Sequence, residues 1–81
     1  MRPLLVVFLI QYNSHMEITV NGTATTLDNG ATVRDLLERL ALGSKFVAVE
    51  RNQLVVPYQT YGETVLHNGD VLEIVTLVGG G

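Results

Sequence analysis

The sequence contains no cysteine. Without a thiol, the chain can form no disulfide framework, hold no metal through thiolate ligands and use no cysteine as a nucleophile. Its two histidines, His15 and His67, are too far apart in the sequence to suggest a metal site. We therefore expect a fold held by one apolar core, with no bound metal or cofactor.

Positive charge is also scarce. Five Lys and Arg stand against eight Asp and Glu, a formal net charge of -3, and the basic residues form no cluster. Phosphate binding needs concentrated Lys and Arg, so we expect no nucleic-acid partner. An acidic chain fits a basic protein partner better.

Long apolar runs are missing as well. The run from Leu4 to Ile10 is too short for a membrane-spanning helix, which needs about 20 apolar residues. A secretory signal with Arg2 at its charged end is an alternative, but no small-residue cleavage site follows. We expect a cytoplasmic location and no membrane partner. Residues 1–15 then form an extra or edge strand, or precede the true initiator, Met16.

What remains is one small domain. The 81 residues are 47% hydrophobic and 16% charged, enough for one core and too few for two. Nothing repeats internally. We predict an N-terminal extension at 1–15, a folded domain at 16–78 and a glycine tail at 79–81.

The first part of this domain has the signature of a β-hairpin. In "MEITVNGTATTLDNG", Asn21–Gly22 separates two strand-like stretches, and both residues accept the positive φ of a type I′ turn. We predict strands at 16–21 and 24–28.

A helix is predicted next, in "ATVRDLLERLALG". Its apolar positions have the spacing of one helix face: Val33, Leu36, Leu37, Leu40 and Ala41. Thr32 and Asp35 have the spacing of a capping box, and Gly43 suits a left-handed exit at the other end. Asp35 and Glu38 then serve capping and solubility.

The remaining segments favour strands. "KFVAVERNQLVV" and "GDVLEIVTLV" are rich in β-branched residues, with a turn predicted at Arg51–Asn52 and a strand end before Pro57. Residues 57–68 are predicted to be irregular, and "HNGD" at 67–70 turns the chain into a last strand at 71–78. The order of the predicted elements, two strands, a helix and then three strands, indicates an α+β fold. We expect a mixed sheet with one helix across one face.

The last strand is apolar on both faces. Its alternating sets are Leu72, Ile74 and Thr76 against Val71, Glu73, Val75 and Leu77. One helix covers only one face, so the other is either a docking surface or is covered by the N-terminal segment, loops or a second copy. Val75 and Leu77 are the better docking candidates because they flank the exit to the glycines. We expect the isolated charged residues of this region to be ordinary surface charges: Glu50, Arg51, Glu63, Asp70 and Glu73.

The chain ends on "TLVGGG". Frayed ends are common, but these glycines follow a predicted strand without a linker. Three extended residues reach roughly 10 Å, which would carry a carboxylate into a narrow cleft of another protein. Without Cβ atoms, such a tail can be gripped closely.

These residues resemble the ThiS family of sulfur carriers of thiamine thiazole biosynthesis, within the ubiquitin-like β-grasp superfamily. The resemblance covers residues 16–81 through "ITVNG", "GATVRDLLERL", "VAVERNQLVVP" and "NGDVLEIVTLVGGG". After Pro57 the family often has a basic residue, where this chain has Tyr58.

The resemblance implies a carrier and not an enzyme. An activating enzyme would use ATP and Mg²⁺ to adenylate the Gly81 carboxylate, a persulfide on a partner protein would convert it to a thiocarboxylate, and thiazole synthase would accept the sulfur. Gly79 and Gly80 would thread the tail. We expect partner docking at Val75, Leu77, Val78 and Tyr58, and no catalytic or metal-binding side chains.

Three alternatives remain open from the sequence. The first is the small subunit of molybdopterin synthase, which shares the fold and the thiocarboxylate chemistry. The second is a protein modifier whose Gly81 forms an isopeptide bond with lysine. The third is a β-grasp binding module with an incidental tail.

Overall fold

A computed structural model describes residues 14–43 and 45–77. Residues 1–13 of the predicted extension at 1–15, together with Val78 and the glycines at 79–81, lie outside these residues, whereas His15 of that extension is the first residue of a strand. In chain order the elements are β1 (His15–Val20), β2 (Thr23–Asp28), α2 (Val33–Arg39), β3 (Val47–Arg51), β4 (Leu54–Val55), the 3₁₀ turn η1 (Tyr58–Thr60) and β5 (Val71–Thr76).

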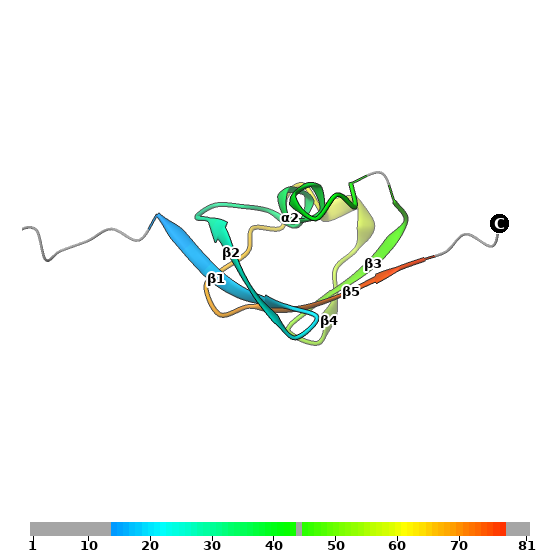
Figure 1. Ribbon diagram of the computed structural model, residues 1–81. Coiled ribbons are helices and arrows are strands. Elements are labelled where there is room, and N and C mark those ends of the chain that lie inside the picture. The colour runs from blue at the N-terminus through cyan, green and yellow to red at the C-terminus, as the bar shows by residue number, and fades with distance from the viewer. Residues whose placement is uncertain (1–13, 44, 78–81) are drawn as a thin grey trace, which may run out of the picture.

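The strands form one mixed sheet in the order β2-β1-β5-β3-β4. β1 and β5 run parallel, whereas the β1–β2, β3–β5 and β3–β4 pairs are antiparallel. The helix α2 lies across one face of this curved sheet (Figure 1). The predicted α+β architecture is confirmed.

The β1–β2 hairpin closes on a type I′ turn. Asn21 has a φ of 49° and Gly22 a φ of 84°, and Val20 pairs with Thr23 across the turn. The left-handed region is open to Gly and tolerated by Asn, so the two residues satisfy the turn without strain. The predicted hairpin is confirmed, with each strand starting one residue earlier than expected.

The helix begins as predicted and ends differently. The Thr32 hydroxyl accepts from the Asp35 amide at 3.2 Å, and the Asp35 carboxylate accepts from the Thr32 amide at 2.9 Å. At the other end Ala41, not Gly43, takes the left-handed conformation, with φ 61°. The prediction for Gly43 is wrong because the buried stripe ends at Leu37, and nothing buries Leu40 well enough to extend the helix.

Two later boundaries also differ from the prediction. The turn between β3 and β4 is Asn52–Gln53, with φ 52° and 71°, one residue after the predicted pair. Arg51 instead pairs with Leu54 in the ladder. β5 ends at Thr76 and not at 78. β4 stops before Pro57, as expected, and Gly69 (φ 89°) makes the turn into β5.

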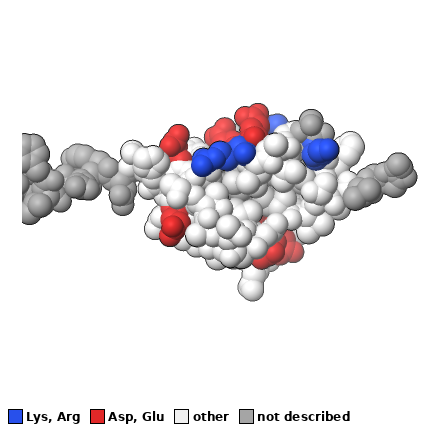
Figure 2. Space-filling model, in the orientation of Figure 1, with Lys and Arg blue, Asp and Glu red and all other residues white. Residues whose placement is uncertain are grey.

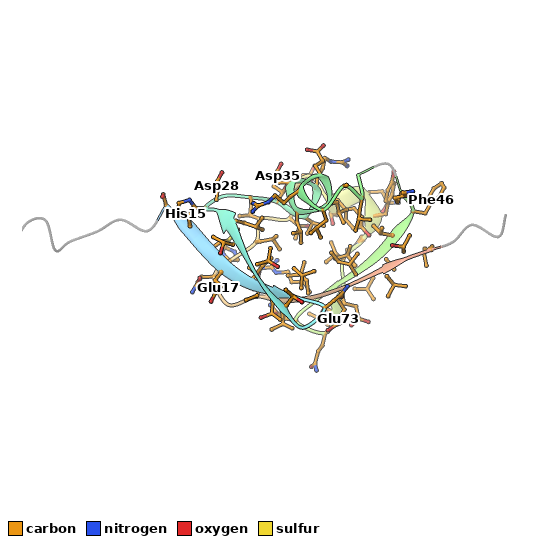
Figure 3. The ribbon with its side chains drawn as sticks, in the orientation of Figure 1. His15, Glu17, Asp28, Asp35, Phe46 and Glu73 are labelled. Carbon is orange, nitrogen blue, oxygen red and sulfur yellow. The ribbon has the colours of Figure 1, made fainter. Side chains whose placement is uncertain are left out.

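The core lies between α2 and the sheet (Figure 3). The helix contributes Val33, Leu36 and Leu37, all buried. Six side chains are almost fully buried, and they come from the helix, three strands and the loop before β5: Ile18, Val33, Leu36, Val49, Leu66 and Leu72. The packing fixes which face of β5 points inward and which is left outside.

Candidate functional site

The central strand of the sheet, β5, leads toward the C-terminus. β3 pairs with it as far as Thr76, and the Leu77 amide still donates to the Phe46 carbonyl oxygen at 2.7 Å. On its other side, β1 pairs with β5 only at Val71 and Leu72 before the hairpin turns away. β5 therefore runs out past the β1–β2 hairpin at one end of the molecule (Figure 1).

Asn21 adds a further connection to this strand. Its side-chain Oδ1 accepts from the Ile74 amide at 2.7 Å, and its Nδ2 donates to the Ile74 carbonyl oxygen at 3.0 Å. The side-chain amide of Asn21 thus makes the two hydrogen bonds that the backbone of a paired strand residue would make, and it extends the β1–β5 ladder. This contact fixes β5 three residues before the end of the described chain.

The predicted alternation along β5 is confirmed from Val71 to Val75, whereas Thr76 of the inner set is exposed. Leu72 and Ile74 are buried under α2, whereas Val71, Val75 and Leu77 are 46%, 58% and 51% exposed on the other side of the strand. The register places Ala48 opposite Val75 and Val55 beside Glu50 on that side. We use the term open face for Ala48, Glu50, Val55, Val71, Glu73, Val75 and Leu77.

Among the described residues, the exposed positive charges lie on one side of the molecule, whereas negative charges lie on both. Glu17, Glu50 and Glu73 occupy outward positions of the sheet, and Figure 3 shows Glu17 and Glu73 on the side away from α2. The exposed cations of the described chain lie on α2 and the loop after it: Arg34, Arg39 and Lys45. In the view of Figure 2, blue side chains follow the helix side, and the sheet side carries only red and white. The open face is therefore apolar and acidic.

Tyr58 lies away from the open face. Its ring packs edge-on against Tyr61, with centroids 5.5 Å apart, and both line a pocket of about 130 Å³ beside α2 with Phe46 and Arg34. Burial raises the pKa of the Tyr61 phenol, which donates to the Val47 carbonyl oxygen at 3.2 Å. Tyr58 thus lies on the helix side of the sheet, whereas Val75 and Leu77, the other described docking candidates, belong to the open face.

Asp70 has a role that its sequence context did not indicate. It is 7% exposed and accepts from Arg51 Nε at 3.0 Å, Asn52 Nδ2 at 3.0 Å and the His67 amide at 2.8 Å. Burial opposes its ionisation, but these hydrogen bonds and the Arg51 charge outweigh that effect and hold the pKa of Asp70 below its ordinary value of 3.8. Asp70 is a buried charge paired with the partly buried Arg51, contrary to the prediction of surface charges.

A Ser-His-Asp set also occurs, at the start of β1. Ser14 Oγ lies 3.2 Å from His15 Nδ1, and His15 Nε2 lies 3.7 Å from Asp28 Oδ1. The His15 and Asp28 side chains are 62% and 89% exposed, so solvent competes for both groups. The imidazole is therefore not held in a buried, fixed orientation. This set lacks the geometry of a catalytic triad.

The described residues show neither a metal cluster nor a membrane span. No three His, Cys, Asp or Glu side chains among residues 14–43 and 45–77 are grouped to hold a metal ion. No helix in the same part of the chain is long and apolar enough to cross a membrane.

A mixed sheet crossed by one helix, with its central strand leading toward the C-terminus, defines a ubiquitin-like β-grasp domain. The crystal structure of the thiamine biosynthesis protein ThiS from Geobacter metallireducens superposes with a TM-score of 0.69 at 33% identity, covering 82% of this chain and all of that one. The ThiS family profile matches residues 10–81. The chain belongs to the ThiS family.

Two curated relatives differ in length. The sulfur carrier protein ThiS of Bacillus subtilis is 46% identical over 50 residues, covering 62% of this chain and 76% of the relative. A thiazole synthase of Paramagnetospirillum magneticum is 41% identical over 66 residues, which are 82% of this chain but 20% of that protein. This chain thus spans a fifth of the synthase and most of the carrier.

Proposed function

We propose that this chain carries sulfur for thiazole formation in thiamine biosynthesis, with Gly81 as the loaded residue. Its membership of the ThiS family carries the proposal, and the position of β5, which ends three residues before Gly79 in the sequence, supports it. The chain would act as a co-substrate of other enzymes, in the cytoplasm, with no catalytic side chain of its own.

The first proposed step activates the carboxylate. An oxygen of the Gly81 carboxylate attacks the α-phosphorus of ATP on a Mg²⁺-dependent activating enzyme, and pyrophosphate leaves. The carboxylate itself is a poor electrophile because it is anionic, whereas the acyl-adenylate has AMP as a good leaving group. ATP and Mg²⁺ belong to the activating enzyme and not to this chain.

The second step exchanges oxygen for sulfur. The outer sulfur of a protein persulfide attacks the Gly81 acyl carbon and expels AMP, forming an acyl disulfide. A second thiol reduces that bond, which leaves the thiocarboxylate on Gly81 and a disulfide on the donor. Because this chain has no cysteine, every thiol in the scheme comes from a partner.

The third step delivers the sulfur to thiazole synthase. A relative of that name contains a segment similar to this chain within one polypeptide, which supports the pairing of carrier and synthase. Gly79 and Gly80 would let the tail enter a narrow cleft because they have no Cβ atoms. Val75, Leu77 and Val78 would dock near that cleft. Tyr58 would contact a partner from the helix side.

Intact-mass spectrometry tests the proposal. The chain is incubated with ATP, Mg²⁺, the activating enzyme of the same organism and a persulfide donor. We expect the mass gain of one oxygen replaced by sulfur, and no gain for the Gly81 deletion. Stable adducts on lysine, or no gain under conditions that load a known carrier, would contradict the proposal. Growth rescue by thiazole after disruption separates this role from molybdopterin synthesis.

A further inference from the structure

Glu50 and Glu73 lie directly opposite each other on the antiparallel strands β3 and β5. Both are exposed, on the open face. Directly opposite residues have Cβ atoms about 4.5–5.5 Å apart, and like charges at that spacing destabilise a sheet. The ion pairs of the described residues are His15–Asp28 and Arg51–Asp70, so neither glutamate has a cation partner there. The fold itself gains nothing from this arrangement.

The side chains around the two glutamates are apolar and exposed. Val75 and Ala48 form the neighbouring pair toward the tail, Val55 lies beside Glu50, and Val71 follows toward the start of β5. A protein docked on these side chains would exclude water from both carboxylates. Buried charges without partners are costly, so such an occupant must bring positive charge of its own.

Arginine has the chemistry that fits this pair. Its guanidinium is planar, stays charged and offers five N–H donors, so one group can bond two carboxylates at once. An ammonium group acts as a point charge and lacks this forked geometry. The exposed cations of the described chain lie on the helix side, so none competes for Glu50 and Glu73.

We propose that Glu50 and Glu73 together receive an arginine side chain of the activating enzyme, inside a collar formed by Ala48, Val55, Val71 and Val75. The proposal rests on the function proposed above and names the contact that selects the partner. The pair is a specificity element and takes no part in the chemistry.

The charge balance favours the activating enzyme as the occupant. Adenylation brings the Gly81 carboxylate together with ATP, and both are anions. An enzyme that binds them must surround the site with positive charge, and that field also attracts an acidic carrier face. Glu73 and Leu77 are four residues apart, about 13 Å along an extended chain, so the glutamates lie near the entrance that the tail would use.

The test compares E50Q/E73Q with E63Q in steady-state adenylation by the activating enzyme, with the chain as the varied substrate. Glu63 is exposed on the loop after η1 and off the open face, which makes it the matched control. We expect the KM of the double variant to rise about tenfold or more, with kcat within about twofold and a weaker dependence of KM on salt. E63Q should behave like the parent chain.

Stability measurements exclude misfolding as the cause. Removing the repulsion between two like charges should leave the thermal midpoint unchanged or raise it, so a higher KM in a protein of equal or higher stability reports lost recognition. Charge reversal on one strand, E73K, should weaken binding further than E73Q because it places a cation against the arginine.

Three results would overturn the inference. The KM of the double variant could equal that of the parent, the variant could self-associate while its KM stays unchanged, or the loss could fall only on sulfur transfer to thiazole synthase. The second result would make the pair a device that keeps copies apart, and the third would assign the face to the synthase. If the parent chain is not adenylated at all, the proposed function fails instead, so the two failures are distinguishable.

Discussion

The side chain of Asn21 hydrogen-bonds both backbone groups of Ile74, 53 residues further along the chain. The same residue supplies the first left-handed position of the β1–β2 turn. One asparagine therefore closes the hairpin and attaches it to the strand that leads to the tail.

Replacing Asn21 by glycine should separate these two roles. Asn21→Gly keeps the left-handed turn but removes both bonds to Ile74, and we expect a loss of about 1–3 kcal/mol in the free energy of unfolding, measured in urea. Asn21→Asp keeps the acceptor for the Ile74 amide but sets a carboxylate oxygen against the Ile74 carbonyl oxygen, so it should also lose stability. Equal stability of the glycine variant and the parent would show that these bonds contribute nothing.

A glycine substitution at the end of α2 should instead raise the stability of the protein. Ala41 adopts φ 61°, a conformation that costs an L-residue about 1–2 kcal/mol and glycine nothing. Glycine also gives the unfolded chain more conformational freedom, which lowers the free energy of unfolding by about 0.4–1 kcal/mol and cancels part of that gain. We expect Ala41→Gly to stabilise the protein by about 0.5–1 kcal/mol in thermal unfolding.

Gly43→Ala is the companion variant. Gly43 lies outside the left-handed region, and an added Cβ would meet the flexible Glu38 side chain at 3.3 Å. Its effect should be small. A large loss at Gly43, or a loss at Ala41, would contradict the observed helix ending.

Asp70 makes stability depend on pH. Its pKa is lowered in the folded state, so its contribution is fully present above the unfolded-state value near 3.8 and is lost as pH falls through the lower folded value. Asp70→Asn should cost about 2–4 kcal/mol at neutral pH, because Arg51 loses its charged partner, and less at acidic pH.

Urea unfolding at pH 7 and pH 3 checks this prediction. Asp28→Asn is the control because the Asp28 side chain is 89% exposed. A cost for Asp70→Asn that does not shrink at low pH would rule out ionisation of Asp70 as its source.

A substitution in the core should change stability, whereas a deletion in the tail should change adenylation. Leu37 is 5% exposed between α2 and the sheet, so Leu37→Ala should cost about 2–5 kcal/mol through lost burial and the cavity left behind. Deleting Gly81 should leave the thermal midpoint nearly unchanged and abolish adenylation. A large fall in the midpoint on deleting Gly81 would contradict the division between a folded domain and a tail.

Several features were predictable from the sequence because their causes are local. The Asn21–Gly22 turn, the Thr32–Asp35 capping box and the alternation along β5 depend on residues one to three positions apart. Their backbone sterics and hydrogen bonds can therefore be predicted from spacing alone. The same alternation placed Val75 and Leu77 on the face opposite Leu72 and Ile74, and left open whether that face is covered. The composition determined that no thiol of this chain could carry sulfur.

Only the tertiary structure decided which distant residues meet. The parallel β1–β5 pairing brings Asn21 to Ile74, and the β3–β5 register sets Glu50 opposite Glu73 and the β3–β4 turn beside Asp70. The tertiary structure also shows that Ala41 takes the left-handed position at the end of α2 and that Tyr58 lies off the open face. Strand order and register depend on how the whole core packs around α2, so no short stretch of sequence determines them.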